Sequence, residues 1–164
     1  MNTFRTRTLG VVAAAAVALW ASASLAATVI DVTLWDKGAA VTMGTDLAYA
    51  SPSPDLSVAT MGIKASPVTA RAGVVTFHVT NSSTDTIHEM IVMYLADPAQ
   101  PLPYIAADMR VDEDKAGDKG EVSELDPGAS GELTLALKPG KYLLICNVPG
   151  HFAAGMWTEF EVTK

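Results

Sequence analysis

Apolar and polar residues alternate along several short segments of the chain with the two-residue period of a β-strand. In residues 74–80, for example, Val75, Phe77 and Val79 fall on one face and His78 falls on the other. Strand-like segments occupy residues 30–34, 61–69 (interrupted by Pro67), 74–80, 87–95, 131–137, 141–146 and 157–162. Turn residues separate them, as in Asp126-Pro127-Gly128. The pattern predicts an all-β domain built as an antiparallel sandwich or barrel.

Two segments do not follow this rhythm. Residues 37–54 contain Gly, Ser and Ala and predict a long loop. Residues 96–124 begin with three prolines and predict an insertion of loop structure, with a short helix over residues 104–109. The charged run at residues 112–115 is typical of a solvated loop.

The first 27 residues have the order of a secretory signal. Arg5 and Arg7 precede an apolar stretch at residues 9–20, and small residues follow up to Ala26 and Ala27. A permanent membrane anchor is the rival interpretation, but the stretch is rich in Ala and only marginally long for a span. We therefore expect a signal peptide over residues 1–27 and one exported domain over residues 28–164. The expected location is the bacterial periplasm, with no stable membrane insertion after cleavage.

The charge balance limits the partners. The chain has 11 Lys and Arg residues against 18 Asp and Glu residues, and its net charge is −7. A nucleic-acid-binding protein needs basic clusters to neutralise phosphates, so this class is not expected. An acidic surface instead steers the protein toward basic partners.

Cys146 is the only cysteine, so the chain cannot form an internal disulfide. A lone thiol in an exported protein is either a small buried hydrophobe or a functional group. Its neighbours favour function, because His151 and Met156 follow it at regular intervals between two predicted strands. One connection therefore presents a thiol, an imidazole and a thioether.

This combination of side chains suits copper. Thiolate and thioether ligands favour Cu(I), and two imidazoles with one thiolate and a weak axial Met are typical of an electron-transfer copper site. His88, at the start of the predicted strand 87–95, can supply the second imidazole. His78 lies on the polar face of its strand, so we expect it to be exposed and away from the metal. Met43, Met61, Met90, Met93 and Met109 are expected in the core or in loops.

Residues 61–162 resemble a cupredoxin, the type 1 blue copper fold. His88 matches the family's first histidine, residues 146–156 match its ligand loop, and residues 138–142 match the turn and tyrosine that lead into the loop. Four residues separate Cys146 from His151 and four separate His151 from Met156, a spacing similar to rusticyanin, auracyanin and sulfocyanin. The resemblance implies a Greek-key β-sandwich. It also implies one type 1 copper ion held by His88, Cys146, His151 and Met156.

One position departs from the family pattern. Many cupredoxins carry Asn after the first histidine, whereas this chain has Glu89 there and Asn147 after the cysteine. One hypothesis is that donor and acceptor have exchanged places, so that the Asn147 amide donates to the Glu89 carboxylate. The alternative is that Glu89 points into solvent. The resemblance also suggests that the Val148 backbone N–H donates to the Cys146 sulfur.

The resemblance implies a carrier of single electrons between redox proteins, not an enzyme. Multicopper oxidases and copper nitrite reductases need further histidines, and only His78 remains. We expect a monomer that meets redox partners through an apolar patch around His151, formed by Pro149, Gly150, Phe152 and Ala153. The alternative function is copper tolerance or copper delivery, in which the metal is bound for sequestration or transfer.

Overall fold

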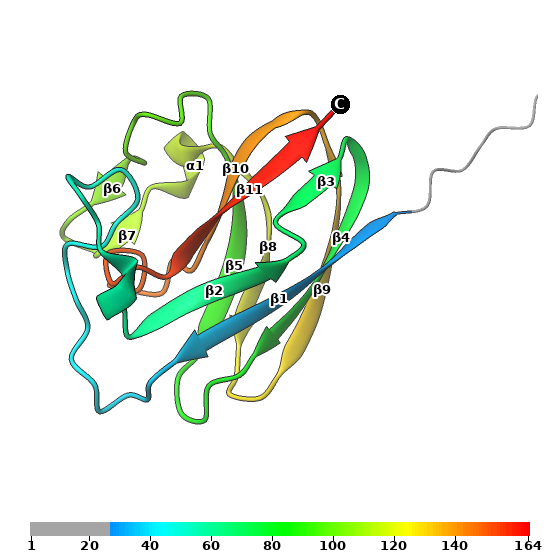
Figure 1. The fold of residues 1–164 in the computed structure, drawn as a ribbon. Helices are drawn as coiled ribbons and strands as arrows, with labels where there is room; N and C mark the ends of the chain where they lie inside the picture. The colour runs from blue at the N-terminus through cyan, green and yellow to red at the C-terminus, as the bar shows by residue number, and fades with distance from the viewer. Residues whose placement is uncertain (1–26) are drawn as a thin grey trace, which may run out of the picture.

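A computed structural model describes residues 27–164, which form two β-sheets packed face to face (Figure 1). One sheet has the strand order β2 (Met61–Ser66), β1 (Thr28–Asp36), β4 (Gly73–Asn81) and β9 (Ser130–Leu137). The other has the order β3 (Thr69–Arg71), β11 (Trp157–Thr163), β10 (Gly140–Ile145), β5 (His88–Tyr94) and β8 (Asp118–Leu125). A small hairpin of β6 (Tyr104–Ile105) and β7 (Arg110–Val111) forms a separate two-stranded sheet.

The β-sandwich predicted from the alternation is confirmed. The predicted strand at 74–80 lies within β4, where Val75, Phe77 and Val79 are buried and His78 is exposed. The sheets are not purely antiparallel, because β1 pairs with β4 in parallel and β11 pairs with β3 in parallel. The break expected at Pro67 separates β2 from β3.

The five-stranded sheet is buried on both faces where β5 and β10 form its centre. Met90, Val92 and Leu144 face the core between the sheets. The residues between them face a second apolar cluster, which contains Ile91, Met93, Leu143 and Ile145. This double burial explains why these strands are continuously apolar in sequence.

The outer cluster is covered by the two segments that broke the strand pattern. The predicted loop 37–54 contributes Tyr49, and the insertion contributes Leu102, Val111 and Ala116. The loop prediction is confirmed, since residues 37–54 contain no helix or strand and the 3₁₀ turn η1 (Leu56–Val58) follows them. Both segments therefore act as walls for one end of the sandwich.

The insertion at 96–124 differs in detail from the prediction. The helix expected at 104–109 is wrong, because Tyr104 and Ile105 pair with Val111 and Arg110 in the hairpin. The charged run forms the short helix α1 (Glu113–Ala116), capped by the Asp112 side chain and by Gly117 in the left-handed conformation. Strand β8 follows immediately and was not predicted.

The connection between β10 and β11 lies between these walls. In Figure 1 it passes beside the β6–β7 hairpin on one side and the cyan segment between β1 and β2 on the other. The Gly150 N–H donates to the Met109 carbonyl at 2.9 Å, and the Leu47 N–H donates to the Ala153 carbonyl at 2.9 Å. The insertion and the long loop thus hold residues 146–156, the predicted ligand loop, from both sides.

The predicted signal peptide, residues 1–27, lies outside the described residues except for Ala27. Within residues 27–164, no helix has the length and apolar character needed to cross a membrane.

Candidate metal centre

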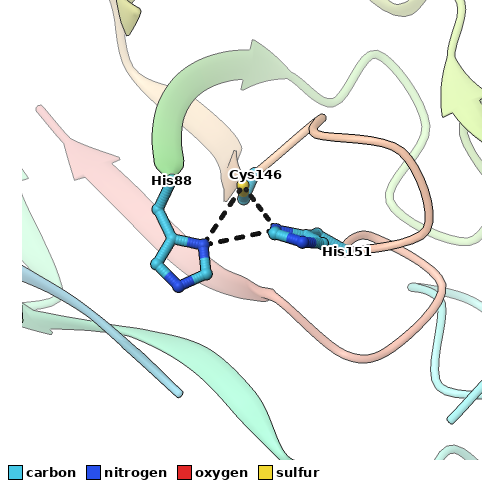
Figure 2. Close-up of side chains that lie close together, drawn as sticks. All are labelled: His88, Cys146 and His151. Atoms are coloured by element: carbon cyan, nitrogen blue, oxygen red, sulfur yellow. Dashed lines mark hydrogen bonds between the residues drawn. The ribbon is translucent and has the colours of Figure 1, made fainter. Parts of the chain in front are cut away.

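Three of the four predicted ligands converge at this end of the sandwich. Figure 2 shows the rings of His88 and His151 turned toward the sulfur of Cys146. The two Nδ1 atoms are 3.3 Å apart, and Sγ lies 3.4 Å from His151 Nδ1 and 4.0 Å from His88 Nδ1. A triangle with these edges has a circumradius of about 2.1 Å, within the range of roughly 2.0 to 2.3 Å for zinc bonds to nitrogen and sulfur. The three atoms are therefore spaced to share one metal ion.

The backbone of the ligand loop ties the fourth predicted ligand to the others. Cys146 follows β10 and Met156 precedes β11; the Cys146 N–H donates to the Met156 carbonyl at 3.0 Å. The Met156 N–H donates in turn to the His151 carbonyl at 3.0 Å. The side chain of Met156 is fully buried in the core between the sheets. The loop needs Gly150 before the histidine, because φ is +85° there, a left-handed conformation that glycine adopts without strain.

His88 is the first residue of β5, the strand that lies next to β10 in the five-stranded sheet. Its ring is completely buried, and its Nε2 lies 2.7 Å from Oδ2 of Asp36. An ionised carboxylate only accepts hydrogen bonds, so Nε2 carries the proton and Nδ1 keeps its lone pair. That lone pair faces Cys146 and His151.

The charge states of the predicted ligands in the metal-free protein follow from burial. Burial raises the pKa of the Cys146 thiol to about 12, although N–H groups of Glu89 and Val148 oppose the rise. The Glu89 N–H donates to Sγ at 3.5 Å. Burial, together with the neighbouring His88, lowers the pKa of His151 to about 4. At neutral pH the imidazole is therefore neutral, as a metal ligand must be, and the thiol needs a cation to become a thiolate.

One hypothesis was that the Asn147 side-chain amide donates a hydrogen bond to the Glu89 carboxylate. The acceptor was predicted correctly, but the donor was not. The Glu89 carboxylate accepts from the Asn147 backbone N–H at 3.0 Å and is buried, so it does not point into solvent. The Asn147 side-chain amide instead donates to the Glu113 carboxylate at 2.7 Å and to the Val111 carbonyl at 3.0 Å. The insertion supplies partners that the local sequence around the cysteine does not reveal.

Residues outside the centre also have defined places. His78 lies 3.1 Å from a Glu132 carboxylate oxygen on the exposed face of the four-stranded sheet, away from the three converging ligands. Phe152 is only 2% exposed and packs in the outer cluster, so its expected membership of a surface patch is wrong. Sequence reasoning missed Asp36 and Glu113, because each meets its partner only through folding.

Comparison with known proteins identifies the class and the family. The fold resembles that of dithionite-reduced auracyanin from the photosynthetic bacterium Roseiflexus castenholzii, with 20% identity, a TM-score of 0.50 and coverage of 84% of this chain and 97% of that one. It also resembles the copper protein rusticyanin, with 19% identity, a TM-score of 0.50 and coverage of 82% and 76%. No curated protein sequence gives a significant match. The model of the sulfocyanin (SoxE) domain matches residues 68–164, and the chain belongs to this family.

The donor set of the centre fits the cofactor of that class. Two imidazole nitrogens and one thiol converge in a buried site, with a buried methionine next in the loop. This is the donor chemistry of a type 1 copper site. The chain is a cupredoxin, and its cofactor is one type 1 copper ion.

Proposed function

We propose that His88, Cys146, His151 and Met156 hold the copper ion and that the protein carries single electrons between redox proteins in the bacterial periplasm. The observation that carries this proposal is the spacing of the three ligand atoms, which share a point about 2.1 Å from each. Copper bound there supplies a one-electron couple between Cu(II) and Cu(I). The order of residues 1–27 supports export.

The protein scaffold supports such a role by holding its ligands still. His88 begins the doubly buried strand β5 and Cys146 directly follows the doubly buried strand β10, and the loop that carries His151 is fastened by backbone hydrogen bonds at both sides. Little rearrangement of these side chains is needed between two oxidation states when their positions are fixed by packing. The rigid site therefore favours rapid electron exchange over ligand binding.

We propose that electrons pass between the copper ion and partner proteins through the loop around His151. Pro149 is exposed, Gly150 and Ala153 are half-buried, and His151 is 5% exposed. Met43 and Met109 border the same loop at Gly150 and are 42% and 52% exposed. This apolar rim suits the small, short-lived contacts of redox proteins.

The same two methionines favour a second candidate function, copper delivery. Exposed thioethers beside the ligand loop can bind Cu(I) on its way in or out of the site. Retention of the metal separates the two functions, because a carrier keeps its copper through many redox cycles and a delivery protein releases it.

The test is to load the protein with ⁶³Cu and cycle it between ascorbate and ferricyanide in the presence of excess ⁶⁵Cu. An electron carrier retains ⁶³Cu through many cycles, as read by mass spectrometry. Exchange within the first few cycles would instead establish copper delivery and overturn electron transfer as the main function. The double variant Met43→Leu/Met109→Leu is the control. Copper exchange should be slower in this variant only if the metal passes through these two methionines.

A further inference from the structure

Asp36 places a buried carboxylate directly behind one of the proposed ligands. It is the last residue of β1, and its side chain is 4% exposed. Its Oδ2 lies 2.7 Å from Nε2 of His88, the ring nitrogen that faces away from Cys146 and His151. It lies outside the residues matched to the sulfocyanin domain, which begin at 68.

The carboxylate is held in this place by the backbone around it. The Leu34 carbonyl accepts hydrogen bonds from the N–H and the hydroxyl of Ser82, both at 2.8 Å, on the segment that leads to His88. After the strand, the Lys37 N–H donates to the Thr60 carbonyl at 2.8 Å. The Gly38 N–H donates to Oδ1 of Asp36 at 2.7 Å. One oxygen is thus occupied by the turn, and the other is left to face the imidazole.

Asp36 is suited to act as an anion there. Both of its oxygens lie against N–H donors, the Gly38 N–H at Oδ1 and Nε2 of His88 at Oδ2, and hydrogen bonds to a carboxylate favour its charged form. Carboxylates behind metal-binding histidines fix the tautomer and ring orientation and increase the basicity of the ligand. An anion near the site also favours the oxidation state with the higher positive charge.

We propose that Asp36 is a positioning residue of the copper centre, which orients His88 through Nε2 and lowers the reduction potential by favouring Cu(II) over Cu(I). This inference rests on the ligand set proposed above. It assigns to β1, which precedes the family-matched region, a direct part in tuning the metal.

The first test compares Asp36→Asn with Asp31→Asn by cyclic voltammetry of the copper-loaded proteins. Asn keeps an oxygen that accepts a hydrogen bond from the Nε2–H group and removes the charge. We expect the ratio of Cu(II) to Cu(I) affinity to fall tenfold or more in Asp36→Asn, a rise in potential of about 59 mV or more. Asp31 is the matched control, because it lies on the same strand with its side chain 82% exposed. Equal potentials in the two variants would overturn the proposal.

A second test needs no variant. In the diamagnetic Cu(I) protein, ¹⁵N NMR should show the His88 proton on Nε2, exchanging slowly with solvent, while the exposed His78 exchanges fast. A proton on Nδ1, or exchange as fast as that of His78, would overturn the proposal. Failure of the ligand set itself is a different result, because the oxidised wild-type protein would then lack its thiolate-to-copper absorption band.

Discussion

The side-chain amide of Asn147 donates a hydrogen bond to the Glu113 carboxylate at 2.7 Å and so joins the ligand loop to α1. The same side chain accepts from the Val111 N–H at 2.7 Å and donates to the Val111 carbonyl at 3.0 Å. The Asn147 side-chain amide therefore pairs with the backbone of β7 as a neighbouring strand would. Through this residue the insertion fixes the position next to Cys146.

Replacing Asn147 with Ala should destabilise the domain. The substitution leaves the buried Val111 N–H without its partner, and an unsatisfied buried group costs about 1–3 kcal/mol. We expect the free energy of unfolding of the metal-free protein to fall by about 2–3 kcal/mol in urea titrations. Glu113→Gln, which keeps an oxygen acceptor, should lose less; an equal or larger loss in Glu113→Gln would contradict the assigned role of the Val111 bonds.

His78 and His88, which lie on consecutive strands of different sheets, should respond oppositely to replacement. His88→Ala removes an imidazole from the buried centre and should abolish or grossly change the visible and EPR spectra of the copper-loaded protein. His78→Ala alters only an exposed ring beside Asp31 and Glu132. Its spectra should remain close to those of the wild type, and the reverse pattern would refute the assignment of His88.

Met156 should tune the potential as an axial ligand. Met156→Leu removes a sulfur but keeps the volume of the side chain, so the fold should lose less than about 1.5 kcal/mol. Cu(II) loses more from the missing donor than Cu(I), so the potential should rise. Met156→Gln supplies a harder oxygen, which lowers it. Voltammetry at one pH should give the order Leu above Met above Gln, and three coincident potentials would show that Met156 only packs.

Glu89 should make the stability of the metal-free protein depend on pH. Burial, with the nearby Glu121 second, raises its pKa from 4.5 to about 7 in the folded state. Between these values the unfolded chain releases a proton that the folded chain keeps, so this carboxyl costs stability as the pH rises. Glu89→Gln removes that cost. Its stability relative to wild type should therefore increase from pH 4.5 to pH 7, and a constant difference in urea titrations would contradict the shift.

The sequence predicted the strands that have a single buried face, such as β4, and the ligand loop around Cys146. It did not predict β8, whose edge position leaves most of its side chains exposed, so that its only buried residue is Val122. The signals for α1 were present in Asp112 and Gly117, which cap it. The charged residues between these two caps led instead to the prediction of a solvated loop.

The environment of the centre was less predictable than its ligands. The proposed ligands Cys146, His151 and Met156 are close in sequence, so their spacing carries the information. Asp36 meets His88 across 52 residues, and this contact exists only because β1 ends beside the start of β5. The local pattern of residues in one sequence does not indicate which distant residues come into contact.

The central claim is that Cys146 binds copper as a thiolate, and the visible spectrum of Cys146→Ser tests it most directly. The copper-loaded wild-type protein should show an intense thiolate-to-copper band. Cys146→Ser should lose this band, with metal content measured in both samples because zinc can occupy the same ligands. Loss of the band in a folded variant is the predicted result. A band that persists in Cys146→Ser would contradict the account.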